Sequence, residues 1–112
     1  MAGDAFPTHK LKVKKKAWLE FEGKNLLGEG GASLLQAIAD TQSLTIAAEQ
    51  LGYSYKYAWM RLKKLHERTG LPVVDSHKGG LGGGGRVTLT PWGRIILEKF
   101  QHAEESNAKD IG

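Results

Sequence analysis

The chain opens with alternating apolar and charged residues. Apolar side chains recur at nearly every second position between Leu11 and Phe21, and the positions between them carry mainly lysine and glutamate. A period of two predicts a half-buried β-strand over residues 10–22 with one charged face. Residues 1–9 are small and polar and predict a flexible lead-in.

Beyond a glycine-rich connection over residues 23–31, apolar residues recur at spacings of three and four, which predicts helices. Ser43 is placed to cap a second helix, and Gly52 to end it in a left-handed turn. Ser54 is placed to cap a third helix, with Gly70 as its stop signal. Two helices joined by a short turn containing glycine form a helix-turn-helix unit. The three predicted helices end near Thr41, Leu51 and Thr69.

A hairpin and a last helix complete the pattern. Two β-prone runs, residues 73–74 and 86–90, flank a glycine-rich stretch and predict the hairpin. Pro91 suits the first position of a helix that runs to about residue 105. The order strand, three helices, hairpin, helix predicts a mainly α (α+β) fold: a winged helix-turn-helix with an N-terminal strand and a C-terminal helix. The domain is expected over residues 10–105, and residues 106–112 are expected to form a flexible tail.

The third predicted helix has one apolar and one basic face when its residues are placed about 100° apart. Trp59 lies beside the apolar face and is expected at the edge of the core. A recognition helix needs this division, since its inner face packs on the preceding helix while its first turns reach base edges and phosphates in the major groove. A solvated helix face is the alternative. The apolar face comprises Tyr55, Ala58, Leu62, Leu65 and Thr69.

The glycine-rich stretch formally satisfies G-x-G-x-x-G at Gly80, Gly82 and Gly85. That nucleotide-binding fingerprint requires a helix at its last glycine, whereas β-prone residues follow here, so the nucleotide-binding interpretation fails. A wing fits better, because a bare backbone can approach a sugar-phosphate chain while Lys78 and Arg86 bind phosphates at its base. A hairpin turn without a partner remains the alternative.

The charged face of residues 10–22 also has two interpretations: it is either a solvated edge or a further contact with DNA phosphates.

These patterns give a predicted set of DNA-contacting residues. Arg61 is expected to pair with guanine edges, and Lys56 and Lys64 to meet phosphates. The full set is Ser43, Thr45, Ser54, Lys56, Tyr57, Met60, Arg61, Lys64, Lys78 and Arg86.

Composition and residue spacing exclude several classes of function. The 112 residues carry a net charge of +4, which weakly favours an anionic partner. There is no cysteine, the four histidines lack metal-ligand spacing, and no catalytic arrangement of serine, histidine and acid stands out. We therefore expect no enzyme activity, cofactor or metal. No apolar run suggests a membrane helix or a signal peptide, so a cytoplasmic protein is expected.

Several of these motifs together resemble a known family. The S-Y-K-x-A-W segment from Ser54, the glycine-rich wing and the L-T-P-x-G segment from Leu89 are similar to the N-terminal domain of ModE, the molybdate-responsive transcriptional regulator. The L-x-x-A-A segment from Leu44 also fits the wider LysR-type winged helices. The resemblance covers approximately residues 10–105 and does not reach the molybdate-binding domains of that family, so direct molybdate binding is not expected.

The resemblance implies a homodimer on a palindromic operator, with the third helix in the major groove and the wing alongside. In the family, the N-terminal strand and the helix after the wing help to form the dimer. Here the alternating strand and the apolar face of the last helix fit that role, or they belong wholly to the monomer core. That face comprises Trp92, Ile96, Phe100 and Ala103.

The leading hypothesis is therefore a sequence-specific DNA-binding transcriptional regulator. The alternative is a winged helix that pairs with another regulator instead of DNA, since fold alone does not decide function. The basic face of the third helix favours the first hypothesis.

Overall fold

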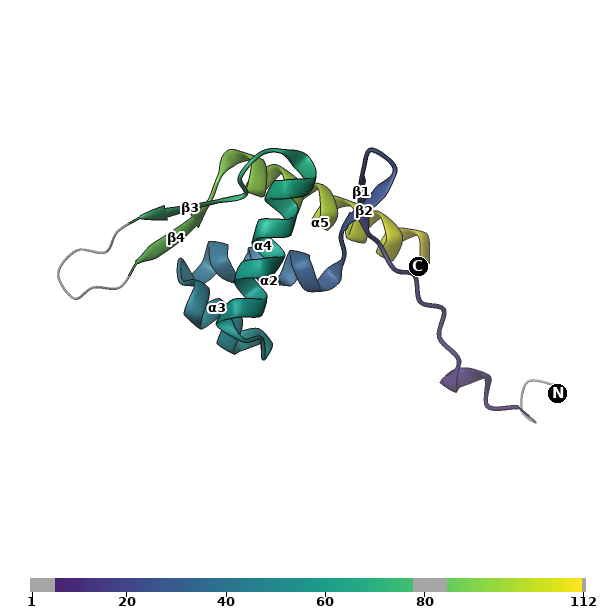
Figure 1. The fold of residues 1–112 in the computed structure, drawn as a ribbon. Coiled ribbons are helices and arrows are strands. Elements are labelled where there is room, and N and C mark those ends of the chain that lie inside the picture. The colour runs from purple at the N-terminus through teal and green to yellow at the C-terminus, as the bar shows by residue number, and fades with distance from the viewer. Residues whose placement is uncertain (1–5, 78–84, 112) are drawn as a thin grey trace.

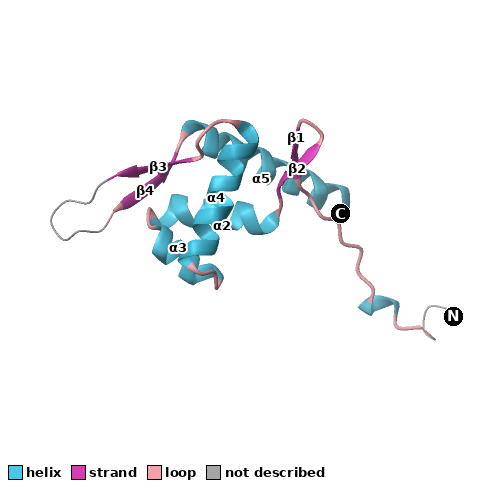
Figure 2. Ribbon diagram, viewed as in Figure 1, coloured by secondary structure: helices cyan, strands magenta, loops and turns pink. Residues whose placement is uncertain are grey.

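The computed structural model describes residues 6–77 and 85–111, with side chains described as far as residue 105. Its helices form one body, from which a β-hairpin and the N-terminal segment project in different directions (Figure 1). Helix dominates the described residues, as Figure 2 shows. The elements are η1 (Thr8–Lys10), β1 (Leu19–Phe21), β2 (Lys24–Leu27), α2 (Glu29–Thr41), α3 (Leu44–Leu51), α4 (Tyr55–Thr69), β3 (Val74–His77), β4 (Arg86–Leu89) and α5 (Pro91–Ile111).

The predicted helix-turn-helix order is confirmed by α2, α3 and α4, and each turn has a local cause. Gln42 ends α2 in the left-handed region, with its backbone N–H bonded to the carbonyl of Ile38. Gly52 and Gly70 end α3 and α4 at φ of 71° and 80°, a conformation that glycine adopts without a steric cost. The core gathers side chains from all the helices and both sheets, and its largest fully buried members are Leu34, Leu35, Ile38, Leu62, Val73 and Phe100.

The predicted hairpin is also confirmed. Strands β3 and β4 pair antiparallel from Val74 opposite Leu89 to His77 opposite Arg86. The backbone N–H of Val87 donates to the carbonyl of Gln42 at 3.0 Å, which ties the hairpin to the end of α2. Residues 78–84, which include the predicted phosphate contact Lys78, lie outside the described residues.

The junction between the wing and α5 explains the T-P-x-G motif. The hydroxyl of Thr90 donates to the carbonyl of Pro72 at 2.8 Å and accepts from the N–H of Gly93 at 3.0 Å, so it caps α5. Gly93 is buried, and a Cβ there would lie within 3.0 Å of the carbonyl oxygen of Val73. The motif is therefore a structural device that fixes the wing to the start of the last helix.

The predicted N-terminal strand is mostly wrong. Only Leu19–Phe21 of residues 10–22 is a strand, and its partner β2 lies in the stretch that we assigned to a glycine-rich connection. Glu22 and Gly23 form the turn between them with φ of 52° and 80°, the two positive values that a type I′ hairpin requires. Because β2 has only four residues, the preceding segment finds no backbone partner among the described residues, and Leu11 and Val13 remain 77% and 75% exposed.

Helix α5 packs on the body as part of the core. Ile96 and Phe100 of the predicted apolar face are buried, together with Leu97, so this face belongs to the monomer core. A side-chain hydrogen bond of 2.7 Å from Gln101 to Gln36 also joins α5 to α2. The helix continues to Ile111 instead of ending near residue 105, since residues 105–111 contain neither glycine nor proline to stop it.

Candidate nucleic-acid interface

Helix α4 divides into the two predicted faces, with two corrections. Ala58, Leu62 and Leu65 are buried against the core. Tyr55 was assigned to the same face but is 58% exposed, because it occupies the first position of the helix, where no other element covers it. The expectation for Trp59, beside that face, is also wrong: this side chain is 44% exposed and is not among the residues packed against the core.

Two serine caps fix the starts of α3 and α4. The hydroxyl of Ser43 accepts a hydrogen bond from the N–H of Ile46 at 3.1 Å, and that of Ser54 accepts from the N–H of Tyr57 at 3.0 Å. Each hydroxyl keeps its own proton and therefore retains a donor for a phosphate oxygen. Thr45, in the first turn of α3, is exposed. The predicted contacts at both helix starts are therefore accessible.

The outward side of α4 is basic and aromatic. Lys56, Tyr57, Met60 and Lys64 are exposed, as the sequence predicts. The ring of Tyr57 meets that of Tyr53 edge to face, with centroids 4.9 Å apart. That contact orients Tyr57 through the turn between α3 and α4, a role for Tyr53 that the sequence analysis missed.

Arg61 lies differently from its companions. It is half-buried, and its Nη2 atom would be 3.2 Å from a Cβ placed on Gly31 of α2. The guanidinium group therefore rests beside Gly31 near the start of α2, where a Cβ would collide with the side chain of Leu27 and crowd the guanidinium. To reach a base edge, the Arg61 side chain must swing outward.

A groove of about 240 Å³ runs between α4 and the β1–β2 hairpin. Arg61, Lys64 and Arg68 line it from α4, where they follow one another at spacings of three and four residues. A guanidinium nitrogen of Arg68 donates to the backbone carbonyl of Asn25 in β2. Arg68 lies outside the set of DNA contacts predicted from the sequence, because the β2 strand that forms the opposite wall was not anticipated.

The wing carries a further exposed cation. Arg86 begins β4 opposite His77, and the imidazole Nε2 of His77 lies 3.0 Å from the hydroxyl of Thr88.

In the part of the chain that the structure describes, no three acidic or histidine side chains gather as metal ligands would. None of the described helices is long and apolar enough to span a membrane.

Two known bacterial proteins are similar in sequence to this chain. The chain is 37% identical over 83 residues to the molybdenum-pterin-binding protein MopB of Rhodobacter capsulatus, a match that covers 74% of this chain and 30% of MopB. It is 39% identical over 75 residues to the molybdenum transport protein ModE of Herbaspirillum seropedicae, which covers 67% of this chain and 28% of ModE. The chain thus spans about a third of the length of these relatives.

Solved structures agree on the fold. The DNA-binding domain of BenM in complex with catB site 1 DNA superposes with a TM-score of 0.53 at 21% identity, over 71% of this chain and 81% of that domain. A MarR family transcription regulator superposes with a TM-score of 0.60 at 17% identity, over 74% of this chain and 55% of the regulator. These neighbours confirm the winged helix predicted from the sequence.

The family assignment rests on the region that contains this interface. The model of the bacterial regulatory helix-turn-helix proteins of the lysR family matches residues 32–94, from α2 to the start of α5. The resemblance to ModE predicted from the sequence motifs is confirmed by the ModE and MopB matches. The chain therefore belongs to the lysR family of bacterial regulatory helix-turn-helix proteins.

Proposed function

We propose that this protein is a sequence-specific regulator of transcription that binds double-stranded DNA and has no catalytic activity. The observation that carries the proposal is the exposed face of α4, where Lys56, Tyr57, Met60 and Lys64 lie together on the second helix of the helix-turn-helix unit. In this motif the second helix enters the major groove. The membership of the chain in a family of regulators supports the same function.

The predicted contacts fall into two groups by role; the role of Lys78, which lies outside the described residues, comes from its position in the sequence. Side chains of the first turns of α4 read base edges, while the serine caps and the wing hold the sugar-phosphate backbone. The base-reading group is Tyr57, Met60 and Arg61; the phosphate-binding group is Ser43, Thr45, Ser54, Lys56, Lys64, Lys78 and Arg86.

Binding to the upstream DNA of its own gene tests the function directly. Fluorescence anisotropy across a salt series should show tighter binding to this DNA than to scrambled DNA of equal length, and the preference should persist as salt rises. Equal, strongly salt-sensitive binding to both would reduce the proposal to non-specific DNA binding. Absence of binding at low salt would contradict it and favour the pairing of this winged helix with another regulator.

Two substitutions on α4 should separate base reading from phosphate contact. We expect Arg61→Ala to weaken binding to the preferred site by roughly 10- to 100-fold, and random DNA much less, because a bidentate arginine–guanine contact discriminates between bases. Lys64→Ala should weaken all DNA alike, since phosphates carry no sequence information. Anisotropy titrations with both DNAs measure the difference. A uniform loss for Arg61→Ala would assign this arginine to the backbone instead.

We further propose that the protein acts as a homodimer on a palindromic site in the cytoplasm. The N-terminal segment supports a dimer, because Leu11 and Val13 expose most of their apolar surface and a second copy would cover it. Sedimentation analysis should give a dimer for the full chain and a monomer for the Leu11→Ser/Val13→Ser double variant. A parent chain that remains monomeric at high concentration would refute the dimer.

We propose that molybdate is not a direct ligand of this chain, since the exposed lysines at the outward face of α4, Lys56 and Lys64, are assigned to DNA. Although the names of two relatives contain molybdenum, a match covering about a third of each relative does not locate their binding site in the shared region.

A further inference from the structure

The groove between α4 and the β1–β2 hairpin holds more positive charge than its surroundings neutralise. Arg61, Lys64 and Arg68 line it, and its other lining residues, Trp18, Asn25, Leu26, Leu27, Gly28, Gly31, Leu34 and Leu65, include no carboxylate. Among the residues that the structure describes, the ion pair found on α4 joins Lys63 to Glu67 at 3.9 Å. That pair involves none of the three cations of the groove.

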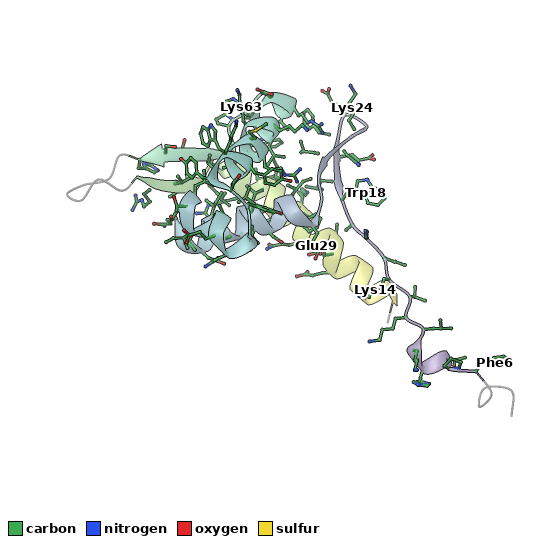
Figure 3. The ribbon with its side chains drawn as sticks, turned by 60° about the horizontal axis from the view of Figure 1, so that its bottom comes forward. Phe6, Lys14, Trp18, Lys24, Glu29 and Lys63 are labelled. Carbon is green, nitrogen blue, oxygen red and sulfur yellow. The ribbon has the colours of Figure 1, made fainter. Side chains whose placement is uncertain are left out.

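The wall opposite α4 is mainly apolar, with Trp18, Leu26 and Leu27, and Asn25 is its polar residue. The backbone carbonyl of Asn25 accepts a hydrogen bond from Arg68, which holds the guanidinium beside β2, and the remaining N–H groups of the guanidinium can donate to a ligand. Gly28 carries no side chain and a Cβ there would meet nothing within 4 Å, so an oxygen-rich group can approach the backbone at this position. The side chains of Leu27 and Arg61 fill the space over Gly31. In Figure 3, Lys24 at the hairpin turn and Lys63 on α4 mark the same edge of the molecule, on either side of this region.

We propose that this groove binds a backbone phosphate of DNA, so that the DNA contact extends from the recognition helix onto the β1–β2 hairpin. The inference rests on the proposed DNA-binding function and adds Arg68 as a phosphate ligand beside Lys64. Arginine is suited to this role, because its planar fork bonds two phosphate oxygens at once while its charge remains constant. With Arg61 turned toward the bases, the repulsion between Lys64 and Arg68 is relieved when a phosphate lies between them.

Replacement of Arg68 tests the site. Arg68→Gln should weaken binding about five-fold at 0.15 M salt, because one lost phosphate contact lowers the slope of log K against log salt by about 0.9. The loss should be the same for the preferred site and for random DNA. Lys99→Gln is the matched control, since it removes the same charge from the exposed surface of α5, outside the groove. It should leave both affinity and slope close to those of the parent.

Arg68→Lys separates charge from hairpin positioning. The lysine keeps the positive charge but not the guanidinium fork, so this variant should retain most of the slope of log K against log salt. Thermal unfolding of each variant checks that the fold persists. The proposal would be overturned if Arg68→Lys lost as much DNA affinity as Arg68→Gln. It would also be overturned if Arg68→Gln lost no more affinity than Lys99→Gln. Saturable binding of inorganic phosphate to this groove without DNA at sub-millimolar concentration would overturn it as well, since it would assign the groove to a free anion.

The failures of the two proposals are distinguishable. If the parent protein binds no DNA, the proposed function fails. If the parent binds DNA and Arg68→Gln binds equally well with an unchanged salt slope, only the phosphate site in the groove is wrong.

Discussion

Gly93→Ala should destabilise the protein by about 3 kcal/mol, because the added methyl group has no space. A Cβ at this position would lie within 3.0 Å of the carbonyl oxygen of Val73, with the carbonyl carbon at 3.2 Å and the Cα at 3.4 Å. All three are backbone atoms, which cannot rotate away as a side-chain terminus does. The carbonyl oxygen of Val73 also accepts the bond from the N–H of Thr90 at 3.0 Å, so its displacement would disturb this hydrogen bond.

Thermal unfolding followed by circular dichroism measures this effect, and the expected loss corresponds to a Tm lower by roughly 12 °C. Gly85→Ala is the matched control, since its Cβ would meet the nearest heavy atom, the carbonyl oxygen of His77, at an ordinary 3.5 Å. We expect its stability to lie within about 0.5 kcal/mol of the parent. A Gly93→Ala variant as stable as Gly85→Ala would show that the junction between wing and α5 is not tightly packed.

Phe100→Ala should cost about 4 kcal/mol, the largest effect expected from a single side chain of α5. Phe100 is 2% exposed and packs in the core with Leu97 and Ala32, so its removal leaves a cavity that the backbone cannot fill. Chemical denaturation gives the free energy of unfolding, and Lys99→Ala on the exposed side of the same helix is the control. The control should change stability by no more than about 0.5 kcal/mol.

The same experiment decides whether α5 serves the monomer or a dimer. Loss of a side chain from a monomer core lowers stability by an amount that does not depend on protein concentration. Loss of a side chain from a dimer interface lowers stability by an amount that changes with protein concentration. We therefore expect the difference between Phe100→Ala and the parent to be constant over a hundred-fold range of concentration. A difference that changes with concentration would place Phe100 at an interface between subunits.

Local signals were sufficient for the helical part of the fold. Ser43 and Ser54 cap α3 and α4, and Gly52 and Gly70 end them, because capping and left-handed termination depend on the residue and its immediate neighbours. Helical periodicity likewise found the buried side of α4. It failed at Tyr55, since burial at the end of a helix depends on what lies beyond that end, which periodicity does not report.

The N-terminal region shows where local signals stop. Alternation from residue 10 to residue 22 predicts a strand, yet a strand forms only where a second strand supplies hydrogen bonds, and β2 supplies them to three residues. The alternation beyond that pairing leaves Leu11 and Val13 exposed on the extended segment.

By itself, the sequence determined the order of the helices, the hairpin and the basic side of α4, because these follow from periodicity, caps and turn residues close together in the chain. Only the tertiary structure decided that Arg61 lies against Gly31, that Arg68 reaches Asn25, and that the face of α5 lies in the core. Each of these joins segments far apart in the sequence. Such contacts depend on how the elements pack, which no local pattern contains.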